Sequence, residues 1–136
     1  MLALVALTTG CQSKTTSTSP APSGVAISVD GGSYVRISAA RLNSMLKAKN
    51  FLLINVHAPY DGEITPTDEF IPYDSIEKNQ ALLPGGKDTR IVVYCRSGYM
   101  SAVAATTLVG LGYTNVMDMD GGMTAWQKAG FPLTRR

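Results

Sequence analysis

The chain has 136 residues, which is enough for one domain of ordinary size with a tail. Hydrophobic residues make up 45% and charged residues 16%, so a buried core is expected and extensive disorder is excluded. The net charge of +2 comes from basic and acidic residues scattered along the chain, and no basic run indicates a nucleic-acid partner.

Residues 1–11 are predicted to form a signal segment that ends at a lipidation site. The apolar run of residues 2–7 is too short to span a bilayer, which takes about 20 residues, but it suits a secretory signal. Gly10 directly before Cys11 resembles the lipobox of bacterial-type lipoproteins, in which the cysteine is lipidated and becomes the mature N-terminus. Thr8 stands where that family usually has leucine, and no basic residue precedes the run. The alternative is an apolar N-terminus of a cytoplasmic protein.

Residues 12–24 are predicted to be a flexible tether, because this segment is rich in Ser, Thr and Pro and has nothing to bury. A lipid on Cys11 followed by a tether would hold the domain at a membrane, outside the cytoplasm, in the periplasm or at the cell surface. A disulfide between Cys11 and Cys95 is the less favoured alternative, because Cys11 falls in the arm rather than in the fold. With one histidine and two cysteines, no structural zinc site is expected, and no cofactor.

The folded domain is expected over residues 25–136, where strand patterns alternate with helix patterns. The elements expected in chain order are strands 25–29 and 33–37, a helix 39–49 capped by Ser38, a strand 51–56, a loop 57–72, a short helix from Asp74 or Ser75 to Leu82, a strand 90–94, a helix 101–111 with Gly112 as C-cap, a strand 115–119 and a helix 123–129 closed by Gly130. This alternation predicts an α/β fold with a mostly parallel sheet, whose ligands bind beyond the carboxyl ends of the strands.

The apolar strand 90–94 runs straight into Cys95, and a short loop containing Gly98 leads to the next helix. A thiol at such a position lies where the N–H groups of a helix start point, which is where thiolates form most easily. We therefore predict that Cys95 is a catalytic nucleophile. The loop after residue 56 and the Asp120-Gly121-Gly122 turn are expected at the same edge of the sheet.

The segment from Tyr94 to Gly98 with Ser101, together with the closing Gly121-Gly122 and Trp126 motif, resembles the single-domain rhodanese sulfurtransferases over residues 34–133. The resemblance implies a three-layer fold with a sheet of about five mostly parallel strands flanked by helices. It also implies transfer of a sulfane sulfur, through a persulfide on Cys95, from a small anionic donor such as thiosulfate to cyanide or a thiol.

The loop after Cys95 is expected to bind the substrate, through backbone N–H groups that converge on the sulfur. Gly98 permits a tight curl, Arg96 would attract an anionic donor, and Ser97 and Ser101 could donate hydrogen bonds. The alternatives are an Arg96 that faces solvent and a Ser101 that only caps the helix. The residues of the predicted loop are Arg96, Ser97, Gly98, Tyr99, Met100 and Ser101.

The length of this loop separates two chemistries. Related phosphatases and arsenate reductases follow a C-x5-R pattern, and here Ser101 occupies the place of that arginine. Phosphate binding needs a bidentate guanidinium, so the loop favours sulfur over phosphate.

Other positions depart from the rhodanese pattern. Met100 stands where many members have an arginine, and Asn55-Val56-His57 stands where they have Asp-Val-Arg. With these changes the sequence does not define which sulfur donor the site recognises. His57 is either a base for Cys95 or a structural residue, and Asp61 and Glu63 either line the pocket mouth or are solvated loop acids. Because the loop arginine is missing, the alternative function is a non-catalytic binding or thiol-sensing module.

Overall fold

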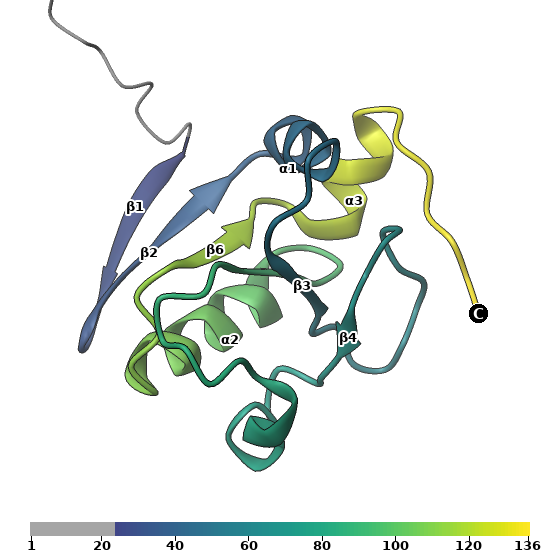
Figure 1. Ribbon diagram of the computed structural model, residues 1–136. Helices are drawn as coiled ribbons and strands as arrows, with labels where there is room; N and C mark the ends of the chain where they lie inside the picture. The colour runs from purple at the N-terminus through teal and green to yellow at the C-terminus, as the bar shows by residue number, and fades with distance from the viewer. Residues whose placement is uncertain (1–23) are drawn as a thin grey trace, which may run out of the picture.

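The computed structural model describes residues 24–136, so the predicted signal segment, its Cys11 and nearly all of the predicted tether lie outside the described residues. The described part forms a six-stranded sheet in the order β1-β2-β6-β5-β3-β4, with helices on both faces (Figure 1). The strands are β1 (Val25–Val29), β2 (Gly32–Ile37), β3 (Leu52–Asn55), β4 (Glu69–Phe70), β5 (Ile91–Tyr94) and β6 (Val116–Met119). The helices are α1 (Ala39–Leu46), the 3-10 helix η1 (Glu77–Leu82), α2 (Tyr99–Gly110) and α3 (Gly122–Lys128).

Five of the six strands run parallel, and only β1 is antiparallel to its neighbour β2. The α/β fold and the mostly parallel sheet are therefore confirmed. The sheet has one strand more than the expected five, because β4 forms inside the segment predicted to be a loop. Two residues are too short for a strand pattern, and β4 is held in place by pairing with β3.

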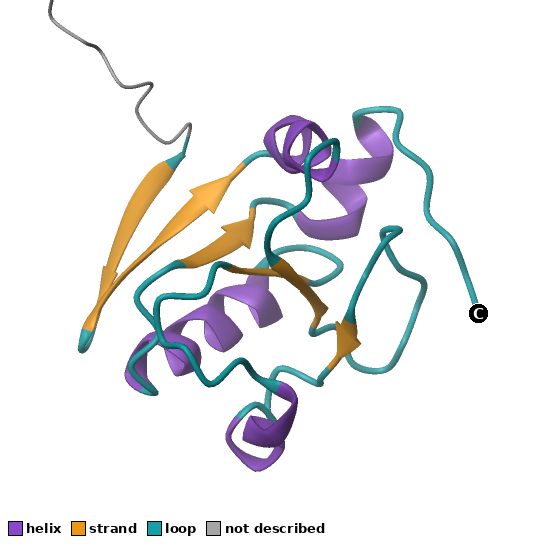
Figure 2. Cartoon of the chain, viewed as in Figure 1, coloured by secondary structure: helices purple, strands orange, loops and turns teal. Residues whose placement is uncertain are grey.

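The core lies in two layers, one on each face of the sheet. On one face α2 contributes Ala104 and Leu108, which pack with Val93 and Val116 of the central strands. On the other face the side chains of α1 and α3 pack against the same strands, among them Leu42, Met123 and Trp126. Trp126 and Phe131 lie in contact in this layer, with ring centroids 4.7 Å apart. The three-layer arrangement is visible in Figure 2, where helices lie above and below the strands.

The helices begin or end at residues that differ from the sequence prediction. Ser38 caps α1 as expected and accepts a hydrogen bond from the Arg41 N–H at 3.1 Å, but the helix ends at Leu46 rather than at residue 49. Lys49 instead reaches the Phe51 carbonyl at 2.8 Å and the Asp68 carboxylate at 2.6 Å, which directs the chain into β3.

The prediction of a side-chain cap on the short helix is wrong. Ile76, whose side chain has no polar atom, occupies the N-cap of η1, and the Ser75 hydroxyl donates to Asp74 at 3.1 Å. The helix α2 begins at Tyr99, two residues earlier than expected, and Leu111 is its C-cap. Gly112 follows the cap with a φ of 95°, in the left-handed region.

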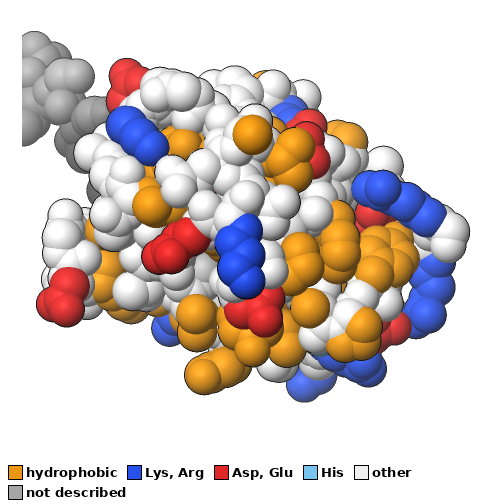
Figure 3. All heavy atoms as spheres, turned by 90° about the horizontal axis from the view of Figure 1, so that it is seen from below, with side chains coloured by type: hydrophobic (Ala, Val, Ile, Leu, Met, Phe, Trp, Pro, Cys, Tyr) orange, Lys and Arg blue, Asp and Glu red, His pale blue; other side chains and the backbone are white. Residues whose placement is uncertain are grey.

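Charges of both signs lie on the face of the molecule that is seen from below in Figure 3. Seen from below, Lys, Arg, Asp and Glu side chains lie singly or in pairs among hydrophobic and uncharged atoms (Figure 3). This face therefore presents a mixed surface rather than an area of one sign.

None of the helices within residues 24–136 has the length and apolar character that crossing a bilayer requires.

Candidate active site

Cys95 lies at the end of the most deeply buried strand. All four residues of β5 are buried between β3 and β6, and the chain leaves the sheet at Cys95 and enters α2 only four residues later. The side chain is a free cysteine and only 1% exposed. The sheet thus places the sulfur at its carboxyl edge, beside the first turn of α2, as expected for a ligand site of a parallel sheet.

The sulfur of Cys95 is held by the loop that follows it. The backbone N–H of Gly98 donates to Sγ at 3.0 Å, and Sγ lies 3.5 Å from the hydroxyl oxygen of the buried Ser101. The Ser101 hydroxyl in turn donates to the Gly98 carbonyl at 3.2 Å. Gly98 has a φ of 106°, which residues with a Cβ rarely adopt. The local backbone therefore offers an N–H group to negative charge on this sulfur.

The Gly121-Gly122 turn brings α3 against the same loop. Both glycines lie in the left-handed region, and a Cβ on Gly122 would lie 2.4 Å from the Cys95 carbonyl oxygen. In this close approach the Met123 N–H donates to the Cys95 carbonyl at 2.8 Å and the Thr124 N–H donates to the Arg96 carbonyl at 3.0 Å. The two glycines therefore allow the backbone of α3 to support the loop that follows Cys95.

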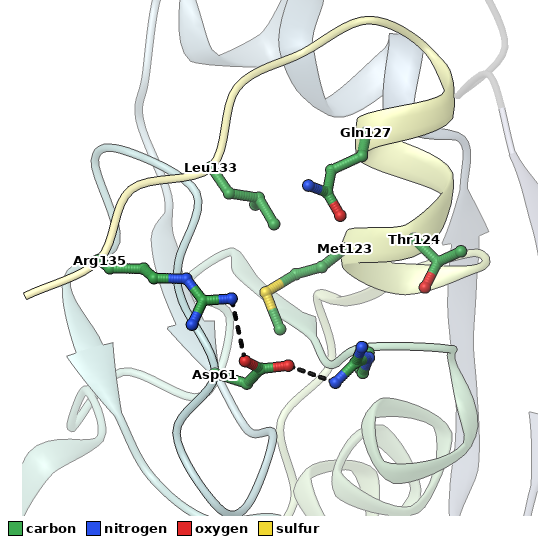
Figure 4. A pocket seen from close by; sticks show the side chains of 7 residues that line it. Asp61, Met123, Thr124, Gln127, Leu133 and Arg135 are labelled. Carbon is green, nitrogen blue, oxygen red and sulfur yellow. Dashed lines mark hydrogen bonds and ion pairs between the residues drawn. The ribbon is translucent and has the colours of Figure 1, made fainter.

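Arg96 points out of the loop and pairs with an acid from a distant segment. Its guanidinium forms an ion pair with Asp61, in the loop after β3. The second Asp61 oxygen pairs with Arg135 at 3.2 Å, as Figure 4 shows. Asp61 is 26% exposed and lines a cavity, so it is a paired residue at a cavity wall rather than a solvated loop acid. Glu63 is paired with Arg136 at 3.0 Å.

The remaining loop side chains supply no positive charge. Met100 packs against the core on the α2 face of the sheet, in the place where many rhodaneses have arginine. Tyr99 and Ser97 are exposed. Within the part of the chain that the structure describes, Arg96 is thus the only cationic side chain of the loop, and it is paired.

His57 follows β3, which pairs with β5, so it leaves the sheet at the same edge as Cys95. Its backbone N–H donates to the Asn55 side chain at 3.0 Å, and its ring atom Nδ1 is buried without a hydrogen-bond partner. No hydrogen bond within residues 24–136 joins the ring to Cys95, and a role of His57 as a base for Cys95 stays a prediction. The amide of the fully buried Asn55 also donates to the Gly62 carbonyl at 2.9 Å, and it thereby braces the loop that carries Asp61.

Asp118, a fully buried acid in β6, is not among the site residues predicted from the sequence. Its Oδ2 pairs with the Arg36 guanidinium at 3.2 Å, while Oδ1 has no hydrogen-bond partner. Burial raises the pKa of Asp118 above its ordinary value, and the nearby Ser101 hydroxyl and Arg36 guanidinium offset only part of that effect. An acidic residue in the middle of an apolar strand pattern was the available signal. Asp118 therefore adds a buried titratable group behind the nucleophile loop.

No metal centre is formed by the described residues, because no three His, Cys, Asp or Glu side chains cluster within 24–136. The chemistry that the site can perform is that of a thiolate held by a backbone N–H group. Such a group can attack an electrophilic sulfur and can hold a persulfide anion.

Comparison with known proteins gives the family. Residues 38–129 match the model of the rhodanese-like domain. A sulfurtransferase of Allochromatium vinosum is 31% identical over 87 residues, which cover 62% of this chain and 79% of that protein. The thiosulfate sulfurtransferase GlpE of Vibrio cholerae is 24% identical over 100 residues, which cover 74% of this chain and 94% of that protein.

Solved structures agree with this result. The crystal structure of a rhodanese-related protein from Thermoplasma volcanium has a TM-score of 0.62 and 28% identity, and covers 73% of this chain and 96% of that chain. Some relatives are longer: the chain spans 21% of the probable adenylyltransferase/sulfurtransferase MoeZ of Mycobacterium tuberculosis. Because the matched segment makes up more than half of the chain, the protein belongs to the family of rhodanese-like domains.

Proposed function

We propose that the protein is a sulfurtransferase that carries a sulfane sulfur as a persulfide on Cys95. The thiolate attacks the outer sulfur of a donor such as thiosulfate, the bond from that sulfur to the rest of the donor breaks, and sulfite leaves with the bonding electrons. An acceptor, cyanide or a thiol, then takes the outer sulfur and returns the thiolate.

The observation that carries this proposal is the Gly98 N–H, which donates to Cys95 Sγ at 3.0 Å. A donor already directed at the sulfur stabilises negative charge there without reorganisation of the loop. Ser101, in the place of the phosphatase arginine, is buried and bound to the Gly98 carbonyl, which supports sulfur rather than phosphate as the group transferred.

The proposal is tested by incubating the protein with thiosulfate and weighing it intact by mass spectrometry. We expect the mass to rise by one sulfur atom and to return on addition of cyanide, with thiocyanate formed in equal amount. Cys95→Ser is the matched control, because it keeps the size of the side chain and removes the nucleophile. Equal thiocyanate formation by this variant would refute the proposed sulfurtransferase activity, and so would the absence of added sulfur on the unsubstituted protein with any of several donors.

The second candidate is a binding or thiol-sensing module without transfer activity. The pairing of Arg96 with Asp61 and the apolar Met100 favour it, because the loop offers no unpaired guanidinium to an anionic donor. This candidate predicts that Cys95 reacts with hydrogen peroxide but takes no sulfur from thiosulfate. The mass experiment above, repeated with peroxide, separates the two functions.

We also propose that a lipid on Cys11, which lies outside the described residues, attaches the domain to a membrane. This lipidation is supported by the small residue before Cys11 and by the Ser, Thr and Pro composition of the segment after it. Detergent-phase partitioning of the expressed protein should be lost in Cys11→Ser. Partitioning of the unsubstituted protein into the aqueous phase would contradict lipidation.

A further inference from the structure

The sulfur of Cys95 and the carboxyl of Asp118 lie on the same side of the sheet. Cys95 packs in the core layer on the α2 face, together with Val93 of β5. Asp118 is the register partner of Val93, and its neighbours Met117 and Met119 in β6 pack in the layer on the opposite face. Side chains alternate between the two faces along a strand, so Asp118 is directed to the α2 face. Two groups that can carry negative charge are thus enclosed in one core layer, each no more than 1% exposed.

The buried Ser101, in the first turn of α2, joins the sulfur to the carboxyl. Its hydroxyl oxygen accepts a hydrogen bond from the Cys95 thiol at a distance of 3.5 Å. Burial raises the pKa of Asp118, and the Ser101 hydroxyl beside the carboxyl offsets part of that effect. In the structure this hydroxyl donates to the Gly98 carbonyl at 3.2 Å, and Oδ1 of Asp118 has no hydrogen-bond partner. Because a hydroxyl can rotate its proton from one acceptor to another, Ser101 can accept from the thiol while it donates to the carboxyl.

The surroundings of Asp118 supply one positive charge and one further acid. Arg36 of β2 pairs with Oδ2 at 3.2 Å and also donates to the Tyr34 hydroxyl at 3.2 Å. The further acid is Asp120, which is exposed directly after β6. The helix α2 has no charged side chain, and β5 brings only the Cys95 thiol to this layer. Ionisation of both the thiol and the carboxyl would therefore set two buried negative charges against a single guanidinium, which is unfavourable.

We infer that Asp118 accepts the proton of Cys95 through Ser101, so that the thiol and the carboxyl share one proton. The S–H bond breaks with its electron pair left on sulfur, and the proton binds to Ser101 Oγ. The original hydroxyl proton moves to Oδ1 of Asp118, and its electron pair stays on Oγ. The negative charge thus moves from the carboxylate to the sulfur, and no second charge is buried. Asp118 acts through Ser101 as a positioning residue, and its part in catalysis rests on the proposed function, because it prepares the attacking thiolate.

The first test measures the rate at which iodoacetamide alkylates Cys95 over a pH series, followed by mass spectrometry of the peptide that contains Cys95. Only the thiolate reacts, so a shared proton makes the rate rise in two steps, one for each proton that the pair loses. We expect Asp118→Asn combined with Arg36→Gln to show one step and to react about tenfold more slowly between the two pH values, the effect of one pH unit on the thiolate population.

The second substitution removes a guanidinium that would otherwise be left unpaired and would favour the thiolate. Asp120→Asn, which removes an exposed carboxylate nearby, is the matched control and should keep both steps. A single step in the unsubstituted protein overturns the inference, and so do two steps that persist in the double variant.

Carbon NMR of the protein distinguishes failure of this inference from failure of the proposed function. With aspartate labelled at the carboxyl carbon, the signal of Asp118 follows the proton on its carboxyl directly. We expect this signal to change in two steps, at the same pH values as the alkylation rate, and to lose the upper step in Cys95→Ser. Two such steps without any sulfur transfer would reject the enzyme and keep the shared proton. Sulfur transfer together with an Asp118 titration that is the same in Cys95→Ser would reject the shared proton.

Discussion

At the scale of single residues, the hydrogen bond to the sulfur of Cys95, the nucleophile that we propose, depends on the conformation of Gly98. Its φ of 106° turns the N–H toward Cys95 Sγ, and an L-residue in this region costs about 1 to 2 kcal/mol. A change at this position therefore alters both the stability of the fold and the charge stabilisation at the sulfur. A second glycine with a similar φ, Gly112, lies past the end of α2 and allows the two effects to be separated.

We expect Gly98→Ala to slow sulfur loading of Cys95 about tenfold, because the N–H is turned away from the developing charge. The free energy of unfolding should fall by about 1 kcal/mol in both Gly98→Ala and the control Gly112→Ala, which has φ 95° and open space around it. Loading is measured by intact mass against time, and unfolding by denaturant titration. Slow loading in both variants would show that strain alone is responsible.

Asp118 makes stability depend on pH. Its pKa is raised in the folded state, chiefly by burial, so the folded protein holds the proton more tightly than the unfolded chain, whose value is about 3.9. The stability that the protonated form contributes is present below about pH 3.9 and is lost as pH rises through the folded pKa. Asp118→Asn cannot titrate and lacks this loss.

As pH rises above about 3.9, the free energy of unfolding of the unsubstituted protein should therefore fall relative to that of Asp118→Asn. The difference should stop changing once the pH exceeds the pKa of Asp118 in the folded state. Denaturant titrations over a pH series measure it. Asp30→Asn, at the exposed turn between β1 and β2, is the control. A difference that does not change with pH would contradict the role assigned to the buried carboxyl.

At the scale of elements, the turn before α3 is the tightest junction of the site. A Cβ at Gly122 would lie 2.4 Å from the Cys95 carbonyl oxygen and 2.5 Å from the Arg96 carbonyl carbon, so backbone has to move. We expect Gly122→Ala to lower the free energy of unfolding by about 1 to 3 kcal/mol more than Gly130→Ala, which has a comparable φ of 86° but nothing within 4 Å. Thermal and denaturant unfolding test this, and equal losses in the two variants would refute a steric role.

The local sequence pattern predicted most helices and strands. It failed where an element is defined by hydrogen bonds or ion pairs to residues distant in sequence. The strands around Asp30-Gly31-Gly32, the buried β5 and the small-residue helix α2 were all predicted within about two residues of their bounds. β4 was missed because it is set by hydrogen bonds from Asp68 N–H to Leu53 and from Ile71 N–H to Asn55, not by its own two residues. The early end of α1 has a similar cause, since Lys49 is held by Asp68.

At the scale of the whole molecule, the C-terminal segment holds the loop that carries Asp61. Glu63 and Thr134 exchange two backbone hydrogen bonds of 2.8 and 2.9 Å, and Arg136 pairs with the Glu63 carboxylate. The wall of the cavity that Asp61 and Arg135 line is therefore built by two segments about 70 residues apart in sequence, which Figure 1 shows side by side.

Removal of residues 134–136 should release this loop without unfolding the sheet. We expect amide hydrogen exchange of Glu63 to accelerate, because its N–H loses the Thr134 carbonyl, while Ile71 N–H keeps its bond to Asn55 and its protection. Exchange measured residue by residue by NMR provides both readings. Unchanged exchange at Glu63 would show that the loop is held by other contacts, and faster exchange at both amides would indicate global destabilisation.

The sequence by itself determined the α/β class and the family and indicated Cys95 as the nucleophile we propose, because these depend on short-range patterns: an apolar strand that ends at Cys95, a glycine three residues later and a Gly-Gly turn before the last helix. The partners of the charged groups were decided only by the tertiary structure. Arg96 meets Asp61 across 35 positions, and Arg36 meets the buried Asp118 across 82. Such pairs leave no local periodicity, since the packing of separate segments brings them together.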